Sequence, residues 1–563
     1  MPNDSESSSG GIARQPGRVI DLHGHQAAEQ LLRQLERTYP DSRRFHSLAR
    51  SAVALGRPFI AAIIRHLDSA EPERLAIFRH ILHRYGLEVQ WVPALMRVAH
   101  DGRVSDSRRL GAMIVLWNSY LHDIVPDDLL LALRNPVGST ATALARTIQA
   151  CHRDWKLVED CRGFLDALSV QPVDILHGVV NALAGMPGEG AEGALRFLAL
   201  HPHPAVAEAA LYALAERPLP GSLRALATLE LNLPPIVAHT VARLLQKHRL
   251  TGYREDPLFQ PNTGCRALVS AVDPAGTRLI WLQVPSELKD DHIALLCVVL
   301  SDMAGLMSAM AVSDLHPAGF APSVPVGTLH EKPGSKLRLP RAGRQVANIS
   351  CLEVPFDYGL RLLAEAVVRN WQTGNRLPVP YRVLFHHVWQ FGATVRAGAY
   401  GGPTGSAPPY LARLDLPDKP DPALADAETE LWSHPLFEGW YFDSEAVRMV
   451  AYDVAALGAG TSATGGLSEE NWRVLLPSLI RLAHDEFGEE VRALYARRLR
   501  RMAEWLGLAG RLHEAAVAAS AACTMEQSPP EANLSVIRLV QRGVLKALRE
   551  IRAGRTPPHD PSL

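Results

Sequence analysis

The stretch HPHPAVAEAALYALAERP, His201–Pro218, predicts one alanine- and leucine-rich helix between prolines. Its segment ALYALAERP has a counterpart 31 residues earlier, VVNALAGMP at Val179–Pro187. A second counterpart, VARLLQKHR, stands 31 residues later at Val241–Arg249. Self-similarity at a period of about 20–50 residues is typical of proteins built from stacked structural repeats. We therefore expect these segments to be copies of one unit.

Apolar residues occupy the equivalent positions of the three copies. Leu183, Leu214 and Leu245 share one register position. The helices that precede two of the copies also align, with ALRFL at 194–198 and ALATL at 225–229. One helix pair cannot bury its apolar face alone, whereas stacked pairs bury a continuous core. The pattern therefore predicts a mainly α chain that begins with an α-solenoid.

These residues resemble the HEAT and armadillo class of helical repeats. The resemblance covers roughly residues 55–250 and is strongest over 172–249. The segment RVSDSRRLGAMIVLWNSYL, Arg103–Leu121, resembles a further unit. The resemblance implies a curved stack of helix pairs whose inner surface holds a partner. It concerns the fold, because one repeat architecture supports many functions.

Polar residues also align in the 31-residue register and form two rows. Positions i and i+4 share a helix face, so both rows lie on one side of three stacked helices. We predict that this strip binds a protein or peptide partner; the alternative is an ordinary solvated face. Neighbouring helices lie about 10 Å apart, so histidines two helices apart are too distant to share a metal ion. The strip consists of His177, Asn181, Glu208, Tyr212, His239 and Arg243.

A small α+β domain is predicted at 255–395, where the repeat pattern ends. CRALVSAV at 265–272 and RLIWLQV at 278–284 flank the turn DPAG at 273–276, which is typical of a hairpin. Further strands are expected at 292–301 and 346–354, and helices at 304–315 and 356–374. This hairpin–strand–helix block after helical repeats resembles uncharacterised bacterial HEAT-repeat-containing proteins, and that resemblance implies no activity.

Two histidines of this domain, His386 and His387, lie between aromatic residues. Adjacent side chains point to different faces of a regular element, so we expect a structural or exposed pair and no shared metal ion. The segment GAYGGPTGSAPP at 398–409 lacks the lysine of a phosphate-binding loop and is predicted to be a linker or surface loop.

The C-terminal region is predicted to be helical from residue 429. Its aromatic residues Trp432, Phe437, Trp440 and Phe442 are expected to anchor a core, or else to mark an interface. A group of arginines suggests contacts with phosphate. Because acidic residues are near in sequence, a solvated, ion-paired face is the preferred interpretation. The arginines are Arg497, Arg498, Arg500 and Arg501, and the acids are Asp485, Glu486, Glu489, Glu490 and Glu504.

The composition limits the partners that we expect. The 563 residues carry a formal net charge of -1, which argues against a general nucleic-acid binder. The start MPNDSESSSGG has no basic region followed by an apolar run, and Ile293–Val312 contains Asp302, so we predict a cytoplasmic protein without membrane insertion. The predicted segments are 1–15 (disordered), 16–250 (HEAT-like repeats), 255–395 (α+β domain), 396–428 (linker or loop), 429–555 (helical domain) and 556–563 (disordered).

No catalytic triad, GxSxG elbow, phosphate-binding loop or metal-ligand cluster is recognisable in the sequence. We therefore predict no catalytic residue, no cofactor and no metal site, and we expect a scaffold or adaptor rather than an enzyme. The alternative function is an enzyme or small-ligand-binding protein whose site lies between the central α+β domain and the helices.

Overall fold

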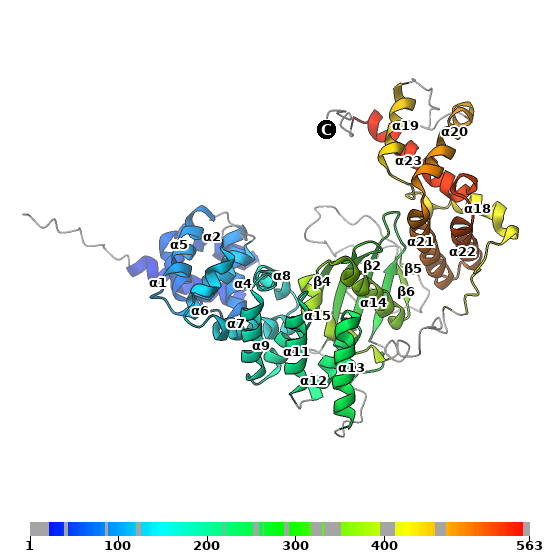
Figure 1. Cartoon of the computed structure of the whole chain (residues 1–563). Coiled ribbons are helices and arrows are strands. Elements are labelled where there is room, and N and C mark those ends of the chain that lie inside the picture. The colour runs from blue at the N-terminus through cyan, green and yellow to red at the C-terminus, as the bar shows by residue number, and fades with distance from the viewer. Residues whose placement is uncertain are drawn as a thin grey trace, which may run out of the picture. The chain divides into compact units, whose positions relative to one another are not determined.

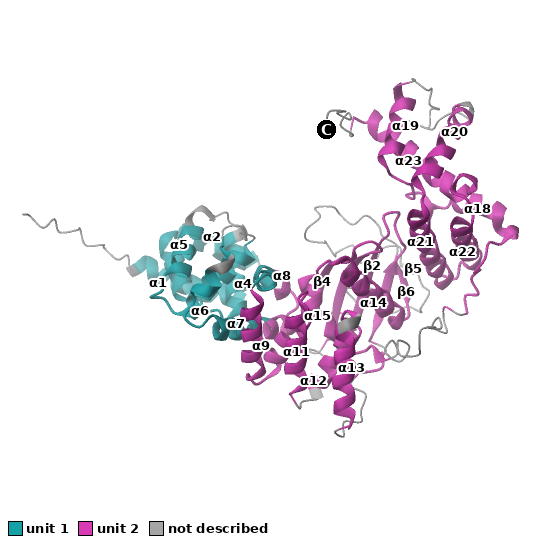
Figure 2. Cartoon of the chain, viewed as in Figure 1, with its two compact units in different colours: residues 1–147, 160–171 teal, residues 148–159, 172–563 magenta. Residues whose placement is uncertain are grey.

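The computed structural model describes two compact units, which Figure 2 shows in different colours. Unit 1 contains residues 1–147 and 160–171, and unit 2 contains residues 148–159 and 172–563. The boundary between the two units falls inside residues 16–250, which the sequence predicts to be one region of helical repeats. The predicted termini 1–15 and 556–563 lie outside the described residues. The structure describes residues 22–38, 43–84, 88–119, 125–217, 220–250, 258–262, 264–286, 292–316, 329–330, 351–393, 411, 413–456 and 469–554.

Unit 1 is helical, and its centre is the almost completely buried helix α6. Arg109 of α6 is itself buried, and it donates hydrogen bonds to the carbonyl oxygens of Ala99 (2.9 Å) and Ala132 (2.8 Å). These bonds satisfy the buried guanidinium and connect three segments of the unit. The helices are α1 (Leu22–Thr38), α2 (Arg43–Ala54), α3 (Arg57–Arg65), α4 (Pro72–Arg84), α5 (Glu88–His100), α6 (Asp106–Asn118), η1 (Asp127–Ala132), and parts of α7 (Pro136–Arg153) and α8 (Leu157–Leu168).

Unit 2 begins its helical part with the predicted helix pairs, and their positions are confirmed. Leu183, Leu214 and Leu245 are all buried, as the shared register predicts. Helix α11 contacts both α9 and α13, and α10 contacts α12 (Figure 1). The helices are α9 (Val173–Ala184), α10 (Glu189–Ala199), α11 (Pro204–Ala215), α12 (Pro220–Glu230) and α13 (Pro235–Leu250).

The 31-residue period also appears in the hydrogen bonds between copies. Arg217 donates from Nη1 to the carbonyl oxygens of Leu183 (3.1 Å) and Met186 (2.9 Å), near the end of α9. His248 occupies the equivalent position one period later, and its Nε2 lies 2.9 Å from the carbonyl oxygen of Ala215, the last residue of α11. Each helix pair therefore donates hydrogen bonds to carbonyl groups at the end of the preceding pair.

The central block contains a six-stranded antiparallel sheet in the order β4-β3-β2-β1-β6-β5. The predicted hairpin, the buried strand at 292–301 and the helix at 356–374 are confirmed. Of the strand predicted at 346–354, the described part forms β6. The strands are β1 (Arg266–Ser270), β2 (Thr277–Pro285), β3 (Ile293–Ser301), β4 (Gly305–Leu315), β5 (Leu329–His330) and β6 (Cys351–Val354), followed by helices α14 (Phe356–Thr373) and α15 (Val379–Trp389).

The helix predicted at 304–315 is wrong, because this segment forms strand β4. Burial in β4 alternates from Ala309 to Ser313, which is the period of a strand. Methionine and alanine favour helices in isolation, but here pairing with β3 overrides the local preference. The turn before β4 needs Gly305, whose φ of 81° is in the left-handed region.

Helix α14 packs directly on one face of the sheet (Figure 1). A Cβ atom on Gly359 of α14 would lie 2.8 Å from the Cβ of Ala267 and 3.0 Å from Leu282, so a glycine permits this close approach. The opposite face carries a second apolar cluster that includes Trp281 and Cys297. Both faces of the sheet are therefore apolar, which explains the continuous apolar sequence of β2 and β3.

The C-terminal region is helical, as predicted. Trp432, Phe437 and Trp440 are buried, so their expected role as core anchors is confirmed, while Phe442 is half-buried. Trp505 of α21 donates a hydrogen bond of 2.9 Å to the carbonyl oxygen of Val269 in β1, which joins this region to the sheet. The helices are η3 (Pro422–Leu424), α18 (Ala425–Leu431), η4 (Pro435–Phe437), α19 (Glu445–Ala456), α20 (Glu469–Glu486), α21 (Glu489–Leu508), α22 (Leu512–Gln527), η5 (Pro530–Ala532) and α23 (Leu534–Arg552).

Two predictions about segments and membranes can be compared with the structure. Of the predicted linker 396–428, residues 396–410 and 412 lie outside the described part of the chain, and helix α18 begins inside the remainder. Within the described residues, no single helix has both the length and the apolar composition to cross a membrane. Helices α2 and α3 meet those two criteria only when they are counted together, and the chain bends by 110° between them.

Candidate anion-binding site

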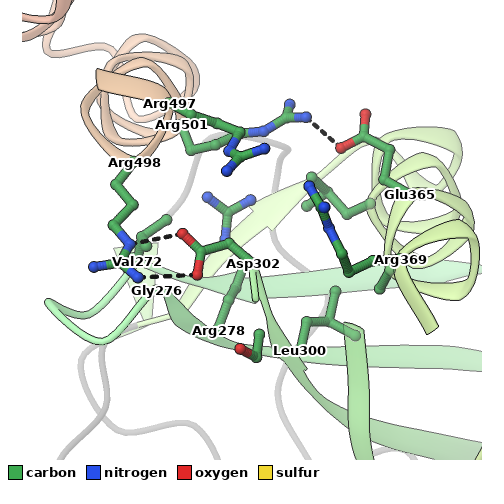
Figure 3. Close-up of a pocket in the computed structure, with 13 residues that line it drawn as sticks. Val272, Gly276, Arg278, Leu300, Asp302, Glu365, Arg369, Arg497, Arg498 and Arg501 are labelled. Carbon is green, nitrogen blue, oxygen red and sulfur yellow. Dashed lines mark hydrogen bonds and ion pairs between the residues drawn. The ribbon is translucent and has the colours of Figure 1, made fainter. Parts of the chain in front are cut away.

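A pocket of about 120 Å³ lies in unit 2 where two strand turns meet helices α14 and α21 (Figure 3). Its lining contains five arginines and two carboxylates, so its formal charge is about +3. Val272, Leu300 and Leu362 supply apolar walls. The charged residues are Arg278, Asp302, Glu365, Arg369, Arg497, Arg498 and Arg501.

The β1–β2 turn forms one edge of the pocket, and its geometry follows from the sequence DPAG. The carboxylate of Asp273 accepts a hydrogen bond from the backbone N–H of Thr277 (2.6 Å), and Gly276 donates to the carbonyl of Asp273 (2.9 Å). Gly276 has a φ of 76°. A Cβ atom on Gly276 would overlap the carboxylate of Asp302, so only glycine lets this turn touch the β3–β4 turn.

The β3–β4 turn forms the next edge, and a buried asparagine of α14 holds it. Asn370 accepts a hydrogen bond from the backbone N–H of Leu306 (2.6 Å) and donates one to the carbonyl of Leu306 (3.1 Å). Its side chain is completely buried. Asn370 therefore fixes the turn that carries Asp302 relative to the helix that carries Glu365 and Arg369.

Arg498 of α21 closes the pocket on the side of the two turns. Its Nε and Nη2 lie 2.6 and 3.1 Å from the two carboxylate oxygens of Asp302. The same guanidinium donates to the carbonyl oxygens of Pro274 (2.6 Å) and Ala275 (3.2 Å). All three guanidinium nitrogens of Arg498 therefore donate to the protein, so its role is to position the two turns.

Arg501 closes the opposite side. It forms ion pairs with Glu365 of α14 and, at 2.8 Å, with Glu504. Glu504 also accepts a hydrogen bond of 3.0 Å from the hydroxyl of Tyr358. Burial disfavours the charged guanidinium of Arg501 and by itself would lower its pKa. The carboxylates of Glu504 and Glu365 have a larger opposite effect, so the pKa of Arg501 is raised. Both terminal nitrogens of Arg501 are thus paired with carboxylates of the protein.

Arg278 differs from these two arginines. It is only 5% exposed, and its side chain points from β2 into the pocket between Asp302 and Arg501 (Figure 3). Its Nη2 is buried and has no hydrogen-bond partner in the described part of the chain. Burial lowers the pKa of Arg278, and the neighbouring Tyr358 hydroxyl opposes this shift. A buried guanidinium with a spare donor is a costly feature that an anion would satisfy.

Two further arginines contribute charge to the pocket without a counterion. Neither Arg369 nor Arg497 makes a hydrogen bond or ion pair with the side chains that the structure describes. Burial and the nearby charge of Arg369 lower the pKa of Arg497. The charge of Arg369 therefore adds to the positive potential at Arg497. Bidentate oxyanions suit guanidinium geometry.

The sequence interpretation of the α21 arginines is partly wrong. Arg500 is an ion-paired surface residue, and its Nη1 and Nη2 each lie 2.6 Å from a carboxylate oxygen of Glu526. Arg497, Arg498 and Arg501 line the pocket instead, and of the five acids named from the sequence only Glu504 is among their ion-pair partners. Sequence reasoning missed Arg278 and Arg369; an arginine inside the apolar strand RLIWLQV was the available signal for Arg278.

The predicted partner strip lies on α9, α11 and α13. The hydroxyl of Tyr212 accepts a hydrogen bond of 3.0 Å from Arg243, so the structure brings these two equivalent residues together. Tyr212 is 43% exposed, and Asn181, His239 and Arg243 are also exposed. The remaining two, His177 and Glu208, are half-buried. Among the described residues, no hydrogen bond joins His177, Glu208 and His239.

The expectation that His386 and His387 point to different faces is wrong. Their ring centroids lie only 3.8 Å apart. Both rings also approach His152, at 4.4 Å and 5.2 Å. The ring atoms extend well beyond Cβ, so side-chain torsions can bring adjacent imidazoles together even where the Cβ directions diverge. Sequence reasoning did not identify His152.

Comparison of the chain with protein-family models, with curated proteins and with solved structures gives no match. The resemblance to HEAT repeats therefore stays a prediction. Any function has to be argued from the side chains and their geometry.

Proposed function

We propose that this chain is a binding protein whose arginine pocket recognises a small molecule through a phosphate group. The proposal develops the alternative function expected from the sequence, a ligand site between the α+β domain and the helices. Arg278, Arg369 and Arg497 come from three different elements and supply donors toward one cavity. A phosphate offers several acceptor oxygens and more than one charge, which matches such a set of guanidinium groups.

The observation that carries the proposal is the buried, unpartnered Nη2 of Arg278. Leaving a buried donor unsatisfied costs about 1–3 kcal/mol, and more for a charged group. Proteins retain such costs mainly at functional sites. We propose binding rather than catalysis, because both carboxylates of the pocket are engaged by Arg498 and Arg501.

The test compares two arginines of the pocket with an arginine of α21 that lies outside it. Isothermal titration with inorganic phosphate at low salt gives the affinity of the wild-type chain. Arg369→Met and Arg497→Met should each weaken binding about 10- to 100-fold, since one charge-assisted hydrogen bond contributes about 1.5–3 kcal/mol. The control Arg500→Met on α21 should bind as the wild type does, because its ion-pair partner Glu526 does not line the pocket. Equal effects in the pocket variants and in the control would contradict the proposal.

A second candidate function is partner binding by a HEAT-like solenoid, through the strip on α9, α11 and α13. The hydrogen bond between Tyr212 and Arg243 favours it. Tyrosine and arginine are enriched at the centres of protein interfaces. The hydrogen bond orders both side chains before a partner binds, so less conformational entropy is lost on binding.

The two strip residues can be tested against a neighbour on the same helix. If a protein co-purifies with the wild-type chain from its native cell, Tyr212→Ala and Arg243→Ala should each abolish its recovery. Arg249→Ala, which changes an exposed α13 residue on another face of the helix, should not. Unchanged recovery in the strip variants would remove this candidate.

We also propose a cytoplasmic location. None of the six cysteines forms a disulfide, and five of them are buried. Cysteines that are not oxidised to disulfides suit a reducing compartment. Fractionation of the native cell, with the chain detected by antibody, checks this location; recovery from an oxidising compartment would contradict it.

A further inference from the structure

Three histidines of unit 2 converge at one buried point, away from the arginine pocket. His152 lies at the end of α7, and His386 and His387 lie in α15. Each histidine offers one ring nitrogen, and these three nitrogens all lie within 4.8 Å of one another. Such a group of imidazoles is unusual in a protein core, where a lone satisfied histidine is the ordinary case.

The surrounding structure holds the three rings in place. Every residue of α15 is buried, so His386 and His387 have little freedom to turn outward. The Nε2 of His152 lies 3.2 Å from the carbonyl oxygen of Val383, one turn earlier in α15. A Cβ atom on Gly193 would lie 2.8 Å from Cε1 of His152, so the glycine provides the space that this ring occupies.

We propose that His152, His386 and His387 together bind one divalent transition-metal ion. Imidazole is a preferred ligand of zinc, cobalt, nickel and copper, and three histidines form a known type of zinc ligand set. The proposal does not depend on the function of the arginine pocket, since the two sites share no residue.

The surroundings of two of the three rings favour the neutral imidazole that a metal ion needs. Burial lowers the pKa of His152 and of His386 well below the usual value, and the neighbouring His387 and Arg196 lower both further. Metal ions bind the neutral imidazole, so no proton has to be displaced from these two rings at neutral pH. Arg196 is paired with Glu192 at 3.5 Å, which offsets its charge near the site.

The site also has room for a fourth ligand. A cavity of about 10 Å³ lies beside His152 and His387 and is lined by Trp155, Ser286 and Ser313. This space is close to that needed for one water molecule. Tetrahedral nitrogen ligands at about 2.0 Å from a metal lie about 3.3 Å apart, so the ring nitrogens would approach one another by at most about 1.5 Å on binding.

Titration of chelator-treated full-length protein with Co²⁺ tests the proposal. Four-coordinate cobalt absorbs strongly in the visible range, and we expect saturation at one ion per chain, followed by loss of the band when zinc is added. His386→Asn and His387→Asn should each weaken cobalt binding at least about 100-fold, because each removes a ligand. The control His248→Gln changes a histidine of α13 that bonds to Ala215, and it should bind as the wild type does.

Two results would overturn the proposal: no uptake of Co²⁺ by the wild-type chain, or equal affinity in the histidine variants. If the variants do not fold, X-ray absorption of the zinc-loaded wild type decides. Three imidazole ligands at about 2.0 Å support the site, whereas sulfur ligands or fewer imidazoles contradict it.

Discussion

Arg498 and Asp302 lie 196 residues apart in the sequence and form a two-point ion pair, with distances of 2.6 and 3.1 Å. The pair joins helix α21 to the β3–β4 turn. It also engages a carboxylate of the pocket lining, and Figure 3 shows the side chain of Arg278 beside this carboxylate. Arg278 therefore faces the cavity without this counterion, and the positive charge of the pocket remains available to a ligand.

Asp302→Asn should destabilise the protein by about 3–5 kcal/mol. The side chain of Arg498 is only 6% exposed, and removal of one partner leaves a buried charge uncompensated. Urea denaturation followed by tryptophan fluorescence measures the change. Glu526→Gln is the control. It removes the surface partner of Arg500, which lies on the same helix as Arg498, and it should destabilise the protein by less than about 1 kcal/mol. Equal losses in the two variants would contradict the structural role of the buried pair.

Gly276→Ala should be clearly more destabilising than Gly510→Ala. Both glycines have positive φ, 76° and 77°, so both variants incur about 1–2 kcal/mol for the left-handed backbone. Only Gly276 faces an obstacle, the carboxylate of Asp302, whereas no atom lies within 4 Å of a Cβ on Gly510. We expect an additional loss of about 1–3 kcal/mol in the first variant. Thermal melting of both variants compares them directly, and similar midpoints would show that the two turns do not touch.

The thiol of Cys265 should react slowly at neutral pH. Burial raises its pKa to about 11, while the hydrogen bond to Asn262 partly opposes the shift. The thiolate is the reactive form, so alkylation at pH 8 should be on the order of 100-fold slower than for a free cysteine of pKa about 8.5. A raised pKa means that the rate continues to increase through pH 10. Iodoacetamide kinetics followed by mass spectrometry of the Cys265 peptide measures it, and a plateau by pH 9 would refute the assignment.

Much of the fold could be predicted from local patterns. The helices between Val173 and Leu250 follow from apolar spacing and prolines, and the DPAG turn follows from residues that are adjacent in sequence. Segment 304–315 could not be assigned this way. Its methionines and alanines favour a helix, and only the partner strand β3 and the contact of Gly305 with Asn370 specify a strand.

The candidate sites were harder to predict for the same reason. The pocket combines Arg278, Asp302, Arg369 and Arg497, which come from four separate elements, and no short spacing encodes their proximity. The sequence did raise phosphate contacts for the arginines of α21. It could not separate Arg500, which is ion-paired with Glu526, from Arg497, which lines the pocket. Likewise, nothing local connects His152 with His386.

Thermal melting of the wild type and of Arg278→Met, with and without inorganic phosphate, tests the central claim most directly. Without phosphate, the variant should melt higher than the wild type, because methionine removes a buried charge with an unsatisfied donor. With phosphate at about 100 times its Kd, the wild type should gain about 2.7 kcal/mol and the variant almost nothing. If the variant gains as much stability as the wild type, Arg278 does not bind the anion and the pocket assignment is wrong.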